Sequence, residues 1–391
     1  MIGQTFLPYA HQSIDAQDLE AVQRALQGDF ITRGPEVEAF EKEFAEFCGS
    51  KYAVAFNTGS AALSGAYYAA GTGPIDRIVS TPNTFIATVG SGVQFGATPV
   101  FVDIDTCTGS VNLEQLALTA NIAVSRGKPI VVPVHFAGPA IDMQKLDSML
   151  ANPEIVVIED ASHAIGSFYP NNGPRVGSCE WSHMTIFSLH PAKTMTTGEG
   201  GVVTTNQEEY FHRLTLFRNN CIERDPRFMK EAPAPWFYEV VDLSNNYNFT
   251  EFQAALGRSQ LKRIESFITK RRELMKAYRE KLRDFRSLTL LSSDQDDQTA
   301  FHLCVVQIDY KAYGTTRTGV MNKLKDSGIG SQVHYIPLYR HPCFAKKFGD
   351  IASYFPKTED YYEKALSIPL YYDLTLEDVD RVVAKLKEVL S

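Results

Sequence analysis

Short apolar segments alternate with longer segments of helical spacing through the first two-thirds of the chain. The apolar segments are rich in Val and Ile, which predicts strands that are buried on both faces. They cover residues 52–56, 77–80, 98–103, 130–134, 155–158, 184–188 and 201–204. Strands that alternate with helices in this way predict an α/β fold, in which a mainly parallel sheet of seven strands is covered by helices.

The pattern changes after Phe249. Residues 249–282 have helical spacing and few helix breakers, which predicts a long amphipathic helix. Its apolar face is expected to hold Phe252, Leu256, Leu261, Ile264 and Phe267. A strand-like segment at 301–310 and a closing helical segment at 376–390 follow. We therefore expect a large domain over residues 1–260 and a smaller C-terminal α+β domain over residues 261–391.

Composition excludes several classes of function. The 391 residues have a net charge of −8, whereas a nucleic-acid-binding protein normally needs a basic surface. No apolar run approaches the length that spans a membrane, and the first residues lack the pattern of a secretion signal. The six cysteines are scattered, with no CxxC pair and no spacing typical of a metal site. We expect a cytoplasmic protein that binds no metal, nucleic acid or membrane.

Three segments contain residues suited to chemistry. In the first, FNTGSAAL, a predicted strand ends at Phe56 and an Ala-rich helix begins after Thr58, Gly59 and Ser60. Free backbone N–H groups and two hydroxyls at a helix start suit a phosphate group. Ser and Thr are also the usual N-cap residues, so simple helix capping explains the same pattern.

The second segment, IVVIEDASHAIGS, places Glu159 and Asp160 at the end of a predicted buried strand, with His163 three residues later. Ligands of α/β proteins bind at the carboxyl ends of such strands, where a carboxylate could keep a heterocyclic nitrogen protonated. Capping of the next helix is the alternative explanation for Asp160.

The third segment, FSLHPAKTMTTGEGG, places Lys193 in a turn between two predicted buried strands. His190 is expected to orient this turn. Burial lowers the pKa of a lysine, which suits an amine that forms a covalent bond to a carbonyl cofactor. An exposed loop lysine is the alternative. The order along the chain is a phosphate cradle, an acid and a lysine, and this order matches the requirements of pyridoxal phosphate.

These segments resemble the DegT/DnrJ/EryC1/StrS family of sugar aminotransferases, and the resemblance extends over nearly the whole chain. Further matching segments are FITRGPEVEAFE, STPNTFIATV, NNYNFTEFQAALG and QVHYIPLY. The resemblance implies an aspartate aminotransferase-like fold of type I, pyridoxal 5'-phosphate as cofactor, and an enzyme that is a transaminase acting on a nucleotide sugar.

The family also implies roles for single residues. Lys193 would bond covalently to the cofactor and move the proton, and Asp160 would pair with the pyridine nitrogen. Phe85 would stack on the ring, and His163 would lie beside the ring oxygen. The phosphate would be held by Thr58, Gly59, Ser60 and Ser188. Asn246 would reach the cofactor of a second subunit, which implies a homodimer with active sites at its interface.

Within the family, the segments PYAHQSID, FITRGP and GIGSQVHYIPLY resemble the transaminases of pseudaminic acid synthesis. That resemblance implies transfer of an amino group from L-glutamate to C4 of a UDP-linked 4-keto-6-deoxy-N-acetylhexosamine. The residues that would contact the sugar nucleotide are Tyr9, Asp29, Phe30, Ile31, Thr32, Gln332, Val333, His334 and Tyr335.

Other functions remain open at this point. The substrate could be another nucleotide-linked 3- or 4-keto sugar with a different base or configuration. Lyases and desulfurases that use pyridoxal phosphate share the fold, and Cys343 is the loop cysteine available for a desulfurase. A regulatory, non-catalytic role is a further alternative. Dinucleotide binding is disfavoured, because GTGPID at 71–76 lacks the complete GxGxxG pattern. The segment 222–242 has no assigned role.

Overall fold

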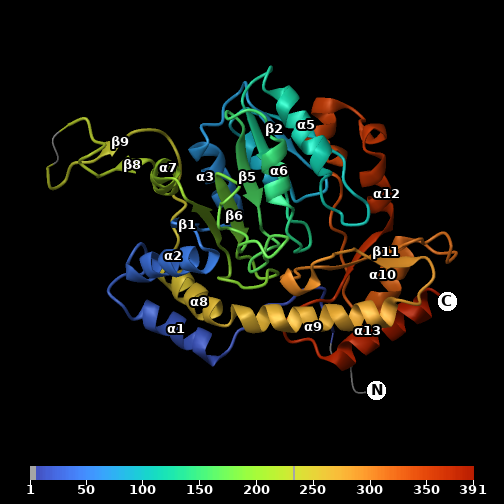
Figure 1. Cartoon of the computed structure of the whole chain (residues 1–391). Helices are drawn as coiled ribbons and strands as arrows, with labels where there is room; N and C mark the ends of the chain where they lie inside the picture. The colour runs from blue at the N-terminus through green and yellow to red at the C-terminus, as the bar shows by residue number, and fades with distance from the viewer. Residues whose placement is uncertain (1–5, 232–233) are drawn as a thin grey trace.

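A computed structural model describes residues 6–231 and 234–391, which include every predicted site residue and most of segment 222–242 (Figure 1). In the described part of the chain, all seven predicted strands form one sheet. The strands are β1 (Tyr52–Phe56), β2 (Arg77–Ser80), β3 (Thr98–Phe101), β4 (Pro129–Val132), β5 (Val156–Asp160), β6 (Met184–Ser188) and β7 (Gly201–Thr205). The prediction of an α/β fold is confirmed.

One strand of the large sheet, β7, runs against all the others. The strand order is β1-β7-β6-β5-β4-β2-β3, and β7 is antiparallel to both of its neighbours while the other neighbouring pairs are parallel. The carboxyl ends of the parallel strands therefore meet at one edge, which is also the edge where β7 begins. Ligands of open α/β sheets bind beside this edge.

Successive residues of each strand enter different hydrophobic cores, as a pleated strand requires. Val54 of β1 packs on one face of the sheet, and its neighbour Ala55 packs on the other. The first face is covered by α3 (Gly59–Ala69), α4 (Ile86–Val93) and α7 (Glu208–Arg218). The second is covered by α2 (Pro35–Cys48), α5 (Leu113–Ala123) and α6 (Met143–Met149). Burial on both faces explains why the strand segments are apolar throughout.

The C-terminal part has a core of its own around a small antiparallel sheet. The sheet order is β10 (Leu288–Leu290), β11 (Cys304–Ile308) and β12 (Ala365–Ile368). This core includes residues of α9 (Ile264–Leu282), α10 (Arg317–Asp326) and α13 (Leu376–Val389). The helix α11 (Pro342–Phe348) instead packs with the core of the large sheet, and α12 (Pro356–Lys364) packs in a separate cluster with Phe136. Short 3-10 turns lie at Asp296–Gln298, Leu338–Arg340 and Ala352–Tyr354. Leu7 also joins the C-terminal core and pairs with Ile329. The boundary near residue 260 remains a prediction.

The predicted long helix is two helices. The first, α8 (Glu251–Lys262), ends at Arg263, and α9 begins at Ile264. The Arg263 guanidinium pairs with Asp15 and Asp18 at the start of α1 (Ala16–Leu26), which holds the break in place. The expectation that Phe252 lies on the apolar face is wrong, since Phe252 is exposed.

Small residues allow the close approach of α8 to its neighbours, while Leu261 joins the core as predicted. Ala254, Ala255 and Gly257 are buried where α8 packs against α1 and α2. A Cβ atom on Gly257 would lie 2.7 Å from the Phe40 ring, so the close approach of α2 depends on this glycine. A search for large apolar residues at helical spacing does not detect such a face.

The segment 222–242 projects from the body of the molecule beside α7, as Figure 1 shows at its left edge. Its described part contains the short pair β8 (Ile222–Glu223) and β9 (Glu239–Val240). Trp236 is 78% exposed and Leu243, directly after the segment, is 87% exposed. No helix within the described ranges is long and apolar enough to cross a membrane.

Candidate active site

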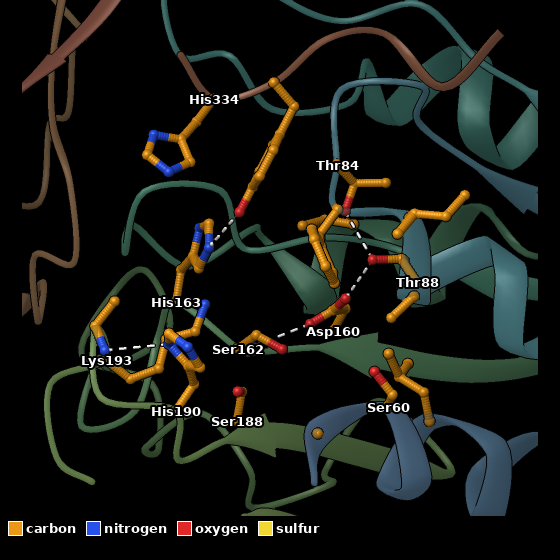
Figure 2. Close-up of a pocket in the computed structure, with 18 of the residues that line it drawn as sticks. Ser60, Thr84, Thr88, Asp160, Ser162, His163, Ser188, His190, Lys193 and His334 are labelled. Atoms are coloured by element: carbon orange, nitrogen blue, oxygen red, sulfur yellow. Dashed lines mark hydrogen bonds between the residues drawn. The ribbon is translucent and has the colours of Figure 1, made fainter. Parts of the chain in front are cut away.

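A cavity of about 1150 Å³ lies at the carboxyl edge of the large sheet. Figure 2 shows its lining residues pointing toward one another from α3, β5, β6 and the segment that follows β6. Most of the predicted site residues line it: Tyr9, Thr58, Gly59, Ser60, Phe85, Asp160, His163, Ser188, Lys193, Gln332, Val333, His334 and Tyr335. Residues that are distant in the sequence therefore meet in one place, because the strand ends converge there.

The start of α3 forms one end of the cavity. Thr58 is the N-cap residue, and its hydroxyl oxygen accepts a hydrogen bond from the Ala61 N–H at 3.0 Å. This bond confirms the capping explanation, and it leaves the hydroxyl hydrogen of Thr58 free to donate. A Cβ atom on Gly59 would lie 3.0 Å from the Ser188 side chain, so the glycine permits α3 to approach the end of β6. The N–H groups and hydroxyls gathered here suit an anion such as a phosphate.

Asp160 ends β5 and is held by two donors. Its Oδ2 accepts a hydrogen bond from the Thr88 hydroxyl at 2.6 Å, and its Oδ1 accepts one from the Ser162 N–H at 3.1 Å. The Thr88 hydroxyl in turn lies 2.7 Å from that of Thr84. These bonds fix the carboxylate in a buried position at the cavity wall. There it can accept a hydrogen bond from a protonated nitrogen of a ligand.

The neighbouring acid, Glu159, points away from the cavity, since successive residues of a strand face opposite sides. Its carboxylate accepts hydrogen bonds from Tyr169 at 2.7 Å and Thr185 at 2.9 Å and lies 2.8 Å from His135. Of the two acids at the end of β5, only Asp160 is available to a ligand in the cavity.

Lys193 lies across the cavity from Asp160 (Figure 2). His190 fixes its turn, because the Lys193 N–H donates to the His190 carbonyl at 2.8 Å and the Ala192 N–H donates to the His190 ring at 3.2 Å. Burial lowers the pKa of Lys193 from 10.5 to about 8, and the charge of Asp160 opposes this shift. At pH 7 roughly a tenth of an amine with this pKa is unprotonated and nucleophilic, whereas less than about one part in a thousand is unprotonated at the ordinary value.

His163 is locked in one tautomer by its neighbours. The Ala137 N–H donates to Nδ1 at 3.2 Å, so the ring proton is on Nε2, which donates to the Tyr335 hydroxyl at 3.0 Å. Burial lowers the pKa of His163 well below its usual value, and the charge of Lys193 adds to this effect. Because Tyr335 accepts from His163, its own hydroxyl hydrogen is left for a group in the cavity.

Aromatic residues form the opposite, more open part of the wall. Phe85 is 56% exposed, and its ring centroid lies 6.3 Å from that of Tyr335. The Tyr9 ring lies 5.5 Å from the His334 ring, and His334 Nδ1 is 2.7 Å from the Ser367 hydroxyl. Burial and the charge of Lys193 lower the pKa of His334 to about 3, so this ring is neutral.

Five predicted site residues do not line the cavity of the same chain: Asp29, Phe30, Ile31, Thr32 and Asn246. Residues 29–32 connect α1 to α2, where Thr32 pairs with Thr250 at the start of α8. Asn246 pairs with Asn219, at the base of the projecting segment 222–242. The cavity of their own chain therefore does not provide the contacts that were expected of them.

Several lining residues were missed by the sequence analysis: Thr84, Thr88, Ser162, Glu199, His302 and His341. Thr84 precedes α4 and Thr88 lies in its first turn, so their contact depends on how the chain enters the helix, which their spacing alone does not reveal. His302 gave no signal, because it precedes an apolar strand and resembles a core residue. Cys343 lines the cavity and is exposed, so the structure leaves it accessible.

Comparisons with known proteins agree with this arrangement. A model of the DegT/DnrJ/EryC1/StrS aminotransferase family matches residues 12–387. The spore coat polysaccharide biosynthesis protein SpsC of Bacillus subtilis is 36% identical over 387 residues, which cover 99% of this chain and 97% of that protein. A UDP-4-amino-4-deoxy-L-arabinose–oxoglutarate aminotransferase of Shewanella sediminis is 32% identical, with 99% and 98% covered. The structure of Helicobacter pylori PseC, an aminotransferase involved in the biosynthesis of pseudoaminic acid, has a TM-score of 0.89 at 28% identity and 99% coverage of both chains.

Proposed function

The chain belongs to the DegT/DnrJ/EryC1/StrS aminotransferase family, and from this membership we propose that it is a pyridoxal phosphate-dependent enzyme that aminates a nucleotide sugar. Its fold is the aspartate aminotransferase-like fold of type I. The specific reaction that we propose is transfer of the amino group of L-glutamate to C4 of a UDP-linked 4-keto-6-deoxy-N-acetylhexosamine.

The residues of the cavity fit pyridoxal phosphate. Thr58, Gly59 and Ser60 with Ser188 would hold the phosphate, because Gly59 allows helix N–H groups and hydroxyls to gather at one point. Asp160 would hold the pyridine nitrogen, and Phe85 would cover one face of the ring. The bound cofactor would supply an electron-accepting ring and a carrier for the amino group between two half-reactions.

Lys193 is the residue on which the proposal chiefly depends. It is a lysine of lowered pKa, about 8, that shares a cavity with a fixed carboxylate and an anion-binding helix start. Lys193 would bond to the cofactor, be displaced by the amino donor, and then remove the proton from the carbon that bears the amino group. Asp160 would keep the ring nitrogen protonated throughout. A His at this position is typical of the dehydratases of the family, so the lysine favours amino transfer.

The proposed sugar rests on two similarities. PseC is named for pseudoaminic acid biosynthesis, and the Shewanella sediminis relative is named for a UDP-linked 4-amino sugar. Tyr9, Gln332, Val333, His334 and Tyr335 line the cavity and would contact the sugar nucleotide. An aminotransferase acting on another UDP- or dTDP-linked keto sugar, or on a GDP-linked one of the perosamine type, is the nearest alternative.

We further propose a homodimer, in which residues 29–32 and Asn246 of one subunit complete the site of the other. Their position outside the cavity of their own chain supports this arrangement. The exposed apolar side chains of Phe30, Ile31 and Trp236 are consistent with a surface that is covered in an assembly. The two-domain division at residue 260 and a cytoplasmic location complete the proposal.

An absorption spectrum of the purified protein tests the proposal most directly. We expect a yellow band that is replaced by the band of the aminated cofactor when glutamate is added. UDP- and dTDP-linked keto sugars would then be screened for reversal of this change, and the UDP-linked 4-keto-6-deoxy-N-acetylhexosamine should reverse it fastest. A yellow band that ignores every amino donor would favour a lyase, and the absence of any band after addition of pyridoxal phosphate would contradict the central claim.

A further inference from the structure

One wall of the cavity combines a lysine with three histidines. Figure 2 shows Lys193, His163 and His334 on one side of the cavity, with Asp160 and Thr88 on the other. Lys193 is the single Lys or Arg among the described lining residues, and His302 belongs to the same wall. The acids that line the cavity are Asp160 and Glu199. Basic groups are therefore concentrated beside the reactive amine.

His302 is the least satisfied member of this wall. It is 3% exposed, and its Nδ1 is buried without a hydrogen-bond partner among the described residues. Its ring centroid lies 4.4 Å from that of His163, whose two ring nitrogens are already used by Ala137 and Tyr335. Nδ1 has no surface exposed to the cavity, so a ligand there cannot reach it. Nε2 also forms no hydrogen bond among the described residues, and because the ring lines the cavity, a bound ligand can supply the partner that buried polar atoms nearly always have.

A fixed positive charge lies directly behind His302. The Arg271 guanidinium of α9 is 1% exposed and donates to the carbonyls of Phe301 at 3.3 Å, His302 at 3.4 Å and Leu370 at 3.0 Å. No carboxylate within the described ranges forms an ion pair with it. An uncompensated buried cation is costly and attracts an anion to its vicinity.

The groups around His302 keep its ring neutral in the absence of an anion. Burial has the largest effect and lowers its pKa well below the usual value. The positive charges of Lys193 and Arg271 lower the pKa further. His163 and His334 are themselves neutral near pH 7, so an anion beside His302 would offset the charges of Lys193 and Arg271 and favour protonation of the imidazole.

We propose that this wall, centred on His302, is the subsite for the α-carboxylate of an amino-acid donor. The inference rests on the proposed aminotransferase function. The start of α3 lies apart from this wall, near Ser60 and Ser188 in Figure 2, and suits the cofactor phosphate. The α-carboxylate of an amino acid is bonded directly to the carbon whose proton Lys193 would remove. This carboxylate must therefore lie close to the Lys193 amine when the donor reacts.

Binding of the α-carboxylate should be accompanied by the uptake of a proton by His302. A carboxylate beside His302 stabilises the imidazolium, so the pKa of His302 is higher in the complex than in the free enzyme. Affinity for the carboxylate should then increase as the pH falls toward the pKa of the complex. Asp160 and Glu199 face the cavity in both states and do not change the direction of this dependence.

The test uses the holoenzyme and 2-hydroxyglutarate, which has an α-carboxylate but no amino group and cannot react. Calorimetric titration at pH 6.5 in two buffers of different ionisation enthalpy gives both the affinity and the number of protons taken up. We expect His302→Asn to weaken binding at least fivefold and to abolish the uptake. The affinity for 4-hydroxybutanoate, which lacks the α-carboxylate, should be the same in both proteins.

Controls separate the subsite from folding and from the proposed function. His212→Asn, on α7 outside the cavity, should bind 2-hydroxyglutarate like the wild type, with the same proton uptake. If His302→Asn does not fold, as judged by thermal unfolding, His302→Gln replaces it. Unchanged affinity and uptake in a folded His302 variant would overturn the subsite, as would a glutamate-reactive wild type that binds no 2-hydroxyglutarate. A wild type that shows no cofactor band would instead contradict the proposed function.

Discussion

Thr88 is the residue that most directly determines where Asp160 points. Its hydroxyl donates to Oδ2 at 2.6 Å, and the Ser162 N–H fixes the other oxygen. A hydrogen bond to a charged group contributes about 1.5–3 kcal/mol, more than one between neutral groups. The carboxylate that would hold the pyridine nitrogen is thus oriented by a residue that does not itself contact that nitrogen.

We therefore expect Thr88→Val to weaken cofactor retention by about tenfold, the equivalent of roughly 1.4 kcal/mol. The measurement is the loss of the yellow band during dialysis against cofactor-free buffer. Thr84→Val is the matched control, because Thr84 contacts Thr88 but not Asp160, and it should have a smaller effect. Equal retention by Thr88→Val and the wild type would show that Asp160 needs no such support.

The lowered pKa of Lys193 also has a consequence for stability. Its folded-state pKa of about 8 lies below the ordinary value of 10.5, so between these pH values the unfolded chain binds a proton that the folded chain does not. Stability should accordingly rise with pH across this window, and the cost of burying the charge is fully present below pH 8.

Lys193→Met removes this charge. In protein prepared without cofactor, the variant should be more stable than the wild type at pH 7. The difference should shrink by on the order of 1–3 kcal/mol when the pH is raised from 7 to 10. Urea denaturation at both pH values measures it. A difference that does not depend on pH would mean that the amine is not desolvated as the structure indicates.

Site residues could be predicted from the sequence where their residue type is unusual for the position they occupy. A lysine between two buried strands and an acid at a strand end are unusual, and both line the cavity. Thr88 and His302 could not be recognised in this way, because a threonine on a helix and a histidine beside an apolar strand are common. Their contacts with Asp160 and His163 arise from tertiary packing, which spacing along the chain does not encode.

At the scale of elements, Gly59 and Gly201 determine how closely α3 approaches the sheet. A Cβ atom on Gly201 would lie 2.5 Å from the Thr58 carbonyl oxygen and 2.7 Å from the Gly59 Cα. These are backbone atoms at the start of α3, so they cannot rotate away. Any side chain at position 201 must displace the helix start from β6 and β7.

Gly201→Ala should therefore destabilise the protein by about 1–3 kcal/mol, the usual range for overpacking. It should also weaken cofactor binding, since the displaced groups are those proposed to hold the phosphate. Gly73→Ala is a suitable control, because its Cβ meets nothing within 4 Å. Its effect should stay within about 0.5 kcal/mol in chemical denaturation. Similar losses in the two variants would argue against a special role of the approach at Gly201.

Elements were predictable where one physical rule dominates. All seven strands of the large sheet were expected, because burial on both faces forces apolar residues throughout. The break at Arg263 was not expected, since its cause is an ion pair with Asp15 and Asp18, more than two hundred residues away in the chain. The direction of β7 was likewise invisible, because strand direction depends on the path of the chain and not on the strand's own residues.

At the scale of the whole molecule, the predicted family and the resemblance to the pseudaminic acid transaminases are confirmed by the family match and by the likeness to PseC. The arrangement of subunits is the remaining prediction. It follows that one chain should not suffice for activity, because residues proposed for one site lie beside the start of α8 and at the base of segment 222–242, outside the cavity of their own chain.

Mixing two inactive variants tests this shared site. Lys193→Ala and Asn246→Ala should each have low activity alone. After denaturation and refolding together in equal amounts, random pairing should restore roughly a quarter of the wild-type activity, because each mixed dimer has one intact site. Recovery would be absent if Lys193 and Asn246 served the same site within one chain. Refolded mixtures of wild type and Lys193→Ala give the reference for refolding losses.

The antiparallel direction of β7 also limits how this chain can change in length. Because β7 begins at the edge where β6 ends, residues 189–200 are attached at both ends to neighbouring strands, with the Leu189 N–H bonded to the Gly200 carbonyl at 2.9 Å. An insertion among them must shift Lys193 relative to Asp160, whereas segment 222–242 projects from the body and none of its described residues lines the cavity. Over evolutionary time, insertions and deletions should therefore accumulate in segment 222–242 and be eliminated from the lysine turn.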